Sequence, residues 1–276
     1  MHDEALSGHG AAVPFFIKEN PVPTHQDLIL DQFTKQVVPF ATAPGIKDED
    51  ALKLVVDFTG TKPDDTLLDV ACGPGLIVCA FAKEVKHATG IDLVPAMIDH
   101  ARGLQQQNGL TNVTWQVGAV QPLPYPDASF SIITSRYAFH HFVDPEGVLA
   151  EMKRVCTPGG KIVVIDAVIS PDPAKAAAYN RAEKLRDPSH TRALALAELE
   201  LLFKWVGLPA PRKTFYKVEA DLEDSLQRSF PNPGDADKLR QMFVESLDDD
   251  GLGVGARRED GKIRFAYPIA VLVADR

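Results

Sequence analysis

The chain has 276 residues, of which 45% are hydrophobic and 24% charged, so it can bury a sizeable core and lacks the composition of a disordered protein. Its net charge of -9 disfavours double-stranded nucleic acid as a partner, and its longest apolar runs are too short to cross a bilayer. The acidic N-terminus lacks the pattern of a secretory signal and the three cysteines lack the spacing of a zinc site, so we expect a soluble, cytoplasmic protein without a metal centre.

Two helices are predicted before the first strand. Residues 1–23 are polar with scattered glycine and proline, and we expect a loosely held arm there. Thr24 and Asp27 have the spacing of a capping box, and four large apolar residues then follow at helical spacing. These residues are Ile29, Phe33, Val37 and Phe40. A Pro-Gly loop over 41–47 leads into a second predicted helix over 48–58.

From residue 66 the sequence alternates short apolar runs with helical patterns. The apolar runs, which predict strands, are 66–70, 87–92, 113–117, 130–135 and 161–166. Helical patterns follow residue 75 and cover 95–107 and 145–156. Because strands that alternate with helices pair in parallel, and because these runs are apolar throughout, we expect a parallel sheet covered by helices on both faces.

The alternation stops after Pro171. Two further helices are predicted, one over 173–185 and one from Leu194 to Trp205. Near the C-terminus, the segments 253–258 and 262–274 flank Glu259-Asp260-Gly261, and an Asp-Gly pair is a strong hairpin signal. We therefore expect two antiparallel strands that close the sheet.

A glycine-rich turn follows the first predicted strand. Asp69 precedes Gly73 by four residues in the run Asp-Val-Ala-Cys-Gly-Pro-Gly, and the second strand ends at Asp92. Glycine lets the backbone approach a ligand closely, and open α/β folds bind nucleotides at the carboxyl ends of their strands. A dinucleotide fingerprint has a third glycine where this chain has Val78, so the pattern favours an adenosine cofactor without a pyrophosphate, its ribose held by Asp92. The alternative is a tight turn that binds nothing, with Asp92 as a helix cap.

The sequence resembles the class I S-adenosylmethionine-dependent methyltransferases, in the broad subgroup that contains the ubiquinone and menaquinone C-methyltransferases. The resemblance runs from about Thr24 to the C-terminus. Motifs carry it in the order of the family, namely 69–75, 90–92, 118–127 (Gly-Ala-Val-Gln-Pro-Leu-Pro-Tyr-Pro-Asp), 135–144 (Ser-Arg-Tyr-Ala-Phe-His-His-Phe-Val-Asp) and 158–161. It implies an α/β fold with a doubly wound, mostly parallel, seven-stranded Rossmann-like sheet whose last strand is antiparallel, a helical N-terminal cap and an insertion near the C-terminal strands.

This resemblance suggests a division of the chain into four parts. They are an N-terminal arm and cap helix over 1–47, a cofactor-binding α/β core over 48–170, a helical lid over 171–215 and C-terminal strands over 216–276.

The resemblance also implies a site for S-adenosylmethionine. The loop residues that would hold its methionine moiety are Ala71, Cys72, Gly73, Pro74 and Gly75, with Asp69 orienting the loop and the amino group. The other implied contacts are Asp92 with the ribose, Leu93 and Met97 with the adenine face, Gly118, Ala119 and Val120 with the adenine edge, and the backbone of Ser135 and Arg136 near the sulfonium. The family usually has an aspartate at position 119 that accepts a hydrogen bond from the adenine amino group. We hypothesise that Gln121 or a backbone carbonyl replaces that acceptor.

Catalysis in this family requires few protein groups, because the sulfonium is already activated and alignment supplies much of the acceleration. A general base is needed only where the acceptor loses a proton. The candidates are His140, His141 and Tyr137, which follow the fourth predicted strand. The alternative for the histidine pair is that one of them caps or packs the following helix.

We therefore predict S-adenosylmethionine-dependent methyl transfer to an O, N or C atom of a small-molecule acceptor. One alternative is a cofactor-binding member with another activity, such as a pericyclic reaction, or a binding module. A nicotinamide-dependent oxidoreductase is the other, and Val78 disfavours it. We expect the acceptor to bind between the first helix and the segments 171–210 and 215–248. The sequence indicates neither the acceptor nor an oligomeric state.

Overall fold

The computed structural model describes residues 22–276, and the first 21 residues of the predicted arm lie outside this range. The helices are α1 (His25–Ala41), α2 (Glu49–Thr59), α3 (Leu76–Phe81), α4 (Pro95–Gln107), α5 (Pro145–Val155), α6 (Pro173–Arg186), α7 (Leu196–Trp205), α8 (Leu222–Ser229) and α9 (Asp235–Asp249), with a 3-10 turn η1 (Phe139–His141). The strands are β1 (Thr66–Val70), β2 (His87–Asp92), β3 (Val113–Val117), β4 (Phe130–Arg136), β5 (Cys156–Ile169), β6 (Leu194–Ala195), β7 (Arg212–Asp221), β8 (Arg257–Glu259) and β9 (Lys262–Asp275).

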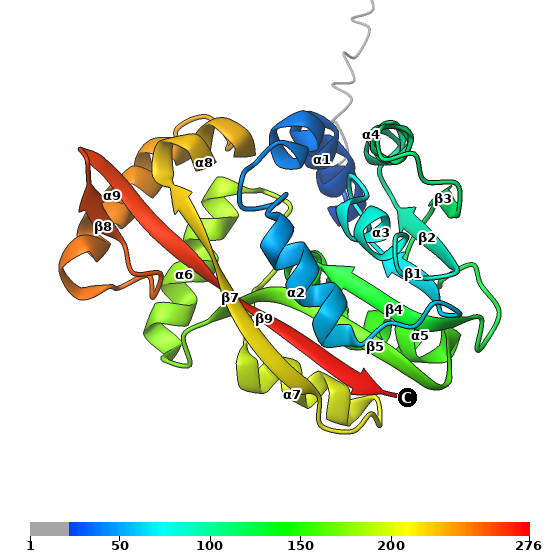
Figure 1. Ribbon diagram of the computed structural model, residues 1–276. Helices are drawn as coiled ribbons and strands as arrows, with labels where there is room; N and C mark the ends of the chain where they lie inside the picture. Colours follow the sequence, from blue (N-terminus) through cyan, green and yellow to red (C-terminus); the bar gives the residue numbers. More distant parts are fainter. Residues whose placement is uncertain (1–21) are drawn as a thin grey trace, which may run out of the picture.

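One twisted sheet organises the molecule, in the order β3-β2-β1-β4-β5-β9-β7 (Figure 1). Strands β1 to β5 pair in parallel, and β9 runs antiparallel between β5 and β7. The predicted fold class is therefore confirmed, including the antiparallel last strand. The Asp-Gly hairpin is also present, although its first strand, β8, spans only Arg257–Glu259.

Helices cover both faces of the sheet (Figure 1). On one face, α5 and α7 bury Leu149, Met152 and Phe203 against the strands. On the other, α2 and α3 bury Val55 and Phe81 in a second cluster. Burial on both faces explains why the central parallel strands are largely apolar, whereas the edge strand β3 has no fully buried residue.

The helix α1 begins with the predicted capping box. The Thr24 hydroxyl accepts from the Asp27 backbone N–H, and the Asp27 carboxylate accepts from the Thr24 N–H. Its apolar stripe packs against the start of α4, where Val37 meets Val94 and Met97. This contact holds α1 over the carboxyl edge of the sheet.

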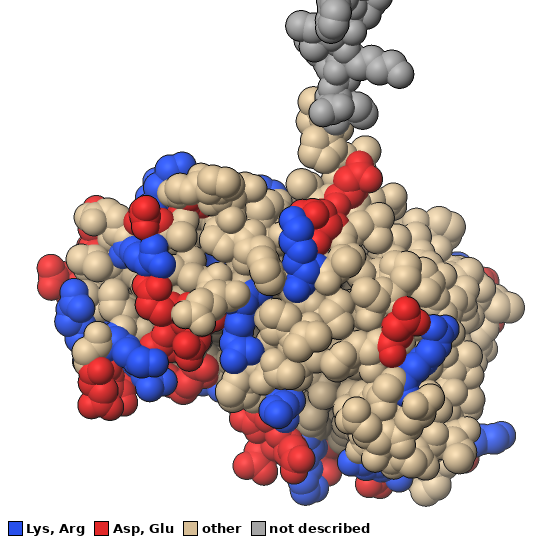
Figure 2. All heavy atoms as spheres, turned by 90° about the horizontal axis from the view of Figure 1, so that it is seen from above, with Lys and Arg blue, Asp and Glu red and all other residues tan. Residues whose placement is uncertain are grey.

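The elements α6, α8 and α9 gather at one end of the molecule with the far ends of β7 and β9 (Figure 1). Their shared cluster includes Leu226, Phe243 and Phe265. Over this end, acidic and basic side chains are interspersed on the face shown in Figure 2. Among the helices of the described range, none is both long and apolar enough to cross a membrane.

The C-terminal third differs in part from the sequence-based expectations. The predicted boundary at 215/216 falls inside β7, which was not recognised as a strand. This strand lies at the edge of the sheet and alternates exposed and partly buried residues, so it has no continuous apolar run. In addition, Leu194 lies in β6 and not in the predicted helix, because it pairs with Val168 of β5.

Candidate functional site

A cavity of about 450 Å³, called here the first cavity, lies at the carboxyl ends of β1, β2 and β4. The predicted site residues that line it are Asp69, Ala71, Cys72, Gly73, Pro74, Asp92, Leu93, Met97, Ala119, Val120, Arg136, Tyr137 and His141. Segments far apart in the sequence thus converge on one space. Four predicted residues lie outside its lining, namely Gly75, Gly118, Ser135 and His140.

Asp92 ties the glycine-rich loop to the end of β2. Its Oδ2 accepts from the Gly73 backbone N–H at 2.8 Å, and its Oδ1 accepts from the Val94 N–H at 2.9 Å. Burial raises the pKa of this carboxyl group, although these backbone bonds oppose the shift. Each carboxylate oxygen has a second lone pair, so Asp92 can also accept hydrogen bonds from a ligand in the first cavity.

Asp69 lies deeper in the same wall. Its Oδ1 accepts from the Thr134 hydroxyl at 2.6 Å, and the side chain is almost fully buried. Burial raises the pKa of Asp69 to about 7, against the opposing effects of the Thr134 bond and the Arg136 charge. A cationic ligand group beside Asp69 would therefore stabilise its ionised form.

The two loop glycines have different structural roles. Gly73 has φ +51°, and a Cβ built on it would meet nothing within 4 Å, so its missing side chain leaves space for a ligand. Gly75 has φ +86°, and a Cβ there would lie 2.5 Å from the Trp115 ring and 2.8 Å from the Ala101 Cβ. Gly75 is thus required for packing of the loop against α4 and β3, which explains why it is absent from the lining.

Two other predicted residues, Gly118 and Ser135, lie next to residues of the lining but do not line the first cavity themselves. The Gly118 N–H donates to the Asp92 carbonyl at 2.9 Å. Ser135 is fully buried in β4 and has the opposite side-chain direction to Thr134 and Arg136, because side chains alternate along a strand.

Gln121 lies near Ala119 in the wall of the first cavity. Gln121 lines the first cavity, and its Nε2 donates to Asp144 Oδ2 at 2.8 Å. Its Oε1 has no hydrogen-bond partner among residues 22–276. The side chain is thus oriented with a free carbonyl oxygen, as the hypothesis for Ala119 requires.

A second cavity, of about 340 Å³, adjoins the first. The residues that line both are Phe33, Phe40, Ile46, Tyr137 and His141. Most of the rest of its wall comes from α6, β7, α8 and β9, with further residues from α1, the 43–45 loop, η1 and β5. It therefore lies where the acceptor was expected, and α1 contributes to both spaces through Phe33, whose ring packs 5.0 Å from the His141 ring.

His140 lines the second cavity and is paired with a buried aspartate that the sequence reasoning missed. The imidazole Nδ1 lies 2.6 Å from Asp166 Oδ1, and the His140 backbone N–H donates to Asp166 Oδ2 at 3.1 Å. In the neutral imidazole, this short contact with a carboxylate oxygen favours the proton on Nδ1, which leaves the Nε2 lone pair free to accept a proton. Burial alone would lower the pKa of His140, but the charge and hydrogen bond of Asp166 outweigh it and raise the pKa. The position of Asp166 at the end of a predicted strand, like that of Asp92, was the signal that could have identified it.

The other two candidate bases are less suited to accept a proton. Burial, followed by the nearby His140, lowers the pKa of His141, whose Nδ1 lies 3.1 Å from the Ser189 carbonyl. Tyr137 has φ +56°, and its hydroxyl lies 2.6 Å from that of Tyr216. Burial raises the pKa of Tyr137, so the phenol keeps its proton at neutral pH.

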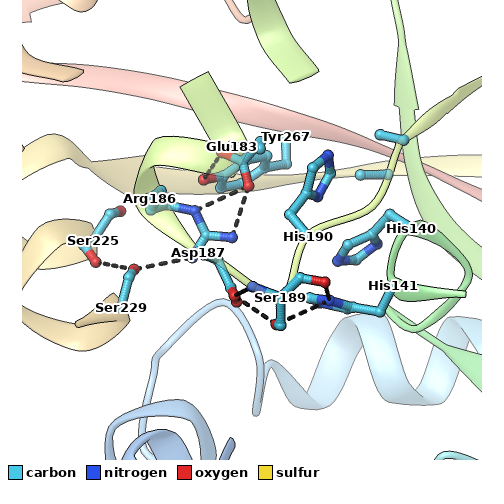
Figure 3. A network of polar contacts seen from close by, with 12 residues as sticks. His140, His141, Glu183, Arg186, Asp187, Ser189, His190, Ser225, Ser229 and Tyr267 are labelled. Atoms are coloured by element: carbon cyan, nitrogen blue, oxygen red, sulfur yellow. Dashed lines mark hydrogen bonds and ion pairs between the residues drawn. The ribbon is translucent and has the colours of Figure 1, made fainter. Parts of the chain in front are cut away.

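A polar network forms the far wall of the second cavity (Figure 3). Arg186 donates to Glu183 at 2.7 Å and to the Ser229 hydroxyl at 2.9 Å. Tyr267 donates to the other oxygen of Glu183 at 3.3 Å. Glu183 and Arg186 of this wall thus neutralise each other, and among residues 22–276 the His140 Nε2 has no hydrogen-bond partner.

Comparisons with known proteins agree with this arrangement. Residues 68–164 match the family described as "Methyltransferase domain". The uncharacterized methyltransferase YcgJ of Bacillus subtilis is 32% identical over 233 residues, which cover 79% of this chain and 91% of that protein. The ubiquinone/menaquinone biosynthesis C-methyltransferase UbiE of Bdellovibrio bacteriovorus is 34% identical over 46% of this chain and 55% of its own length. The crystal structure of the Bacillus subtilis YcgJ protein superposes with a TM-score of 0.75 and 27% identity, covering 82% of this chain and 98% of that one.

Proposed function

Since the chain belongs to the class I S-adenosylmethionine-dependent methyltransferases, we propose that it methylates a small-molecule acceptor whose accepting atom loses its proton to His140. The observation that carries this proposal is the junction of two cavities beside a histidine–aspartate pair. Bound S-adenosylmethionine supplies the activated methyl group.

The residues of the first cavity fit this cofactor. Asp92 offers carboxylate lone pairs to ribose hydroxyls, and Leu93 and Met97 supply apolar surface for adenine. The open space beside Gly73 admits a ligand chain along the loop. Asp69 is positioned to accept from the cofactor's ammonium group, and Gln121 from the adenine amino group.

The second cavity would hold the acceptor. Its aromatic lining, which includes Tyr137, Tyr179 and Tyr267, favours a ring or an apolar chain. His140 would take the proton of the accepting atom at Nε2, and Asp166 would stabilise the resulting imidazolium. This pairing favours hydroxyl groups or acidic C–H groups as acceptors, since these must lose a proton when they are methylated.

Methyl transfer can be tested without knowledge of the acceptor. Purified protein would be incubated with methyl-labelled S-adenosylmethionine and fractions of a metabolite extract, and labelled products would be identified. We expect transfer to a small molecule. His140→Gln should reduce transfer about 10²- to 10⁴-fold, the usual contribution of a general base, while binding of S-adenosylhomocysteine is retained.

His87→Gln is a matched control, because His87 begins β2 at the opposite edge of the sheet. Binding of the cofactor with no transfer to any acceptor would instead indicate a binding module or another reaction. Full transfer by the His140 variant would exclude this residue as the base.

A further inference from the structure

One cationic side chain lies in the wall of the first cavity. Arg136 ends β4, and in the lining formed by the described residues it is the sole lysine or arginine. The same lining contains the carboxylates of Asp69, Asp92 and Asp144. Arg136 therefore places one fixed cation beside three carboxylates in a largely apolar wall.

The guanidinium group is held in place by its neighbours but is only partly satisfied. Nη1 donates to the Ile46 carbonyl at 3.0 Å, and Nη2 donates to the Tyr137 hydroxyl at 3.2 Å. The group also lies 4.2 Å from the centre of the Tyr137 ring. Guanidinium has five N–H donors, so these two bonds leave three, and one of these, at Nε, is buried without a partner.

The charge of Arg136 is also unmatched. Among residues 22–276 it forms no ion pair with a carboxylate. A partly buried charge without a counter-ion costs free energy in the folded protein. Asp69 is near enough for the charge of Arg136 to influence its pKa, yet its Oδ1 is bonded to Thr134. The wall thus holds Arg136 as a cation and Asp69 as an acceptor that are not paired with each other. A zwitterionic ligand needs both, one for its carboxylate and one for its ammonium group.

We propose that Arg136 binds the α-carboxylate of the methionine moiety of the cofactor, while Asp69 accepts from its ammonium group. This inference rests on the proposed function, because it assumes that the first cavity holds S-adenosylmethionine. This role of the Arg136 side chain is separate from the backbone contact of Arg136 that is expected near the sulfonium. The protein then selects ligands that carry an amino acid over nucleosides that lack one.

The choice of ligands tests this subsite on the unmodified protein. Calorimetry would compare S-adenosylhomocysteine with its methyl ester, which keeps the ammonium group but loses the carboxylate charge. A charge-assisted contact from a fixed guanidinium should make the acid bind about 10- to 100-fold more tightly than the ester. Equal affinities would overturn the proposal.

Variants test the residue itself. Arg136→Met should weaken S-adenosylhomocysteine about 10- to 100-fold and change the affinity for 5′-methylthioadenosine, which lacks the amino acid, less than about twofold. The matched control is Arg212→Met, because the Arg212 guanidinium likewise lies over an aromatic ring, that of Phe58, and donates to a backbone carbonyl, yet lines neither cavity. It should leave both affinities within about twofold of the wild type.

Equal losses for both ligands in Arg136→Met, or no loss for S-adenosylhomocysteine, would overturn the proposal. A wild-type protein that binds neither S-adenosylhomocysteine nor 5′-methylthioadenosine would contradict the proposed function itself. If Arg136→Met fails to fold, the acid–ester comparison on the wild type decides the question alone.

Discussion

Replacement of Asp92 by asparagine should weaken cofactor binding with little change in the free energy of unfolding. In the ligand-free protein, both carboxylate oxygens accept backbone N–H bonds, from Gly73 and Val94. Asparagine keeps the shape and one acceptor oxygen but loses the charge and the second acceptor. The loss of one backbone bond costs about 1 kcal/mol of unfolding free energy.

A second effect opposes this loss. Burial raises the pKa of Asp92 in the folded protein above its value in the unfolded chain. A carboxyl with a raised folded pKa reduces stability once pH exceeds that pKa, because the folded state then holds a charge that burial disfavours. A neutral asparagine removes this cost at pH 8. We therefore expect the unfolding free energy of the ligand-free variant to change by less than about 1 kcal/mol.

Binding of S-adenosylhomocysteine has no such compensation. In the proposed function, ribose hydroxyls donate to the charged oxygens of Asp92. The variant loses the charge and one acceptor, so affinity should fall by about 1–3 kcal/mol, or about 5- to 150-fold. Calorimetry at 25 °C gives the affinity, and urea unfolding at pH 8 gives the stability. Asp99→Asn, on the exposed part of α4, is the control. An unchanged affinity for Asp92→Asn would refute the assignment of this carboxylate to the ribose.

Three further predictions follow from the geometry of the site. In Asp166→Asn, methyl transfer should fall about 10²- to 10⁴-fold. The acidic limb of its pH profile should move to lower pH, because the Asp166 charge raises the pKa of His140. A limb that stays in place would contradict this coupling. Binding of S-adenosylhomocysteine near pH 7 should release protons, because the pKa of Asp69 is about 7 and an adjacent ammonium group favours ionisation of this carboxyl. Calorimetry in buffers of different ionisation enthalpy would detect this release. Asp69→Asn should abolish it. Gly75→Ala should lower the unfolding free energy by about 1–3 kcal/mol more than Gly73→Ala in urea titrations, because both place alanine at a positive φ but only the methyl group at position 75 meets packed atoms. Gly73→Ala should weaken S-adenosylhomocysteine more than Gly75→Ala does, because its methyl group enters the open space beside the loop. The reverse pattern would exclude the roles given to the two glycines.

The parallel part of the sheet was predictable because its signals are local. Most of the strands β1 to β5 are apolar runs next to a helix with a clear apolar face, so the pattern and the packing agree. The strand β7 gives no such signal. It pairs only with β9 and alternates its side chains between solvent and protein, and a mixed polar pattern over 212–221 does not distinguish a strand from a loop. What defines β7 is its partner, about fifty residues later in the chain.

The residues of the candidate site also differ in whether the sequence predicts their position. The glycine-rich loop and Asp92 belong to adjacent strands that carry recognisable motifs, and the structure brings them together at one cavity. Arg186 and Glu183 of the second cavity belong to α6, whose pattern predicts a helix but not which side chains meet a cavity. Their position depends on α1, β7 and α8 closing around them, and these contacts are fixed only by the folded chain.

The pair of His140 and Asp166 shows how the sheet itself connects distant motifs. The parallel register of β4 and β5 aligns Arg136 with Ile165, so the next residues of both strands emerge at the same edge. There the chain turns into η1 after β4, while β5 continues from Asp166 to Ile169, which brings His140 to the Asp166 carboxylate. A shift of one residue in this register would direct Asp166 to the opposite face of the sheet, since side chains alternate along a strand. The apolar residues that fix the register of β4 and β5 therefore also determine whether the chain has a base beside its second cavity.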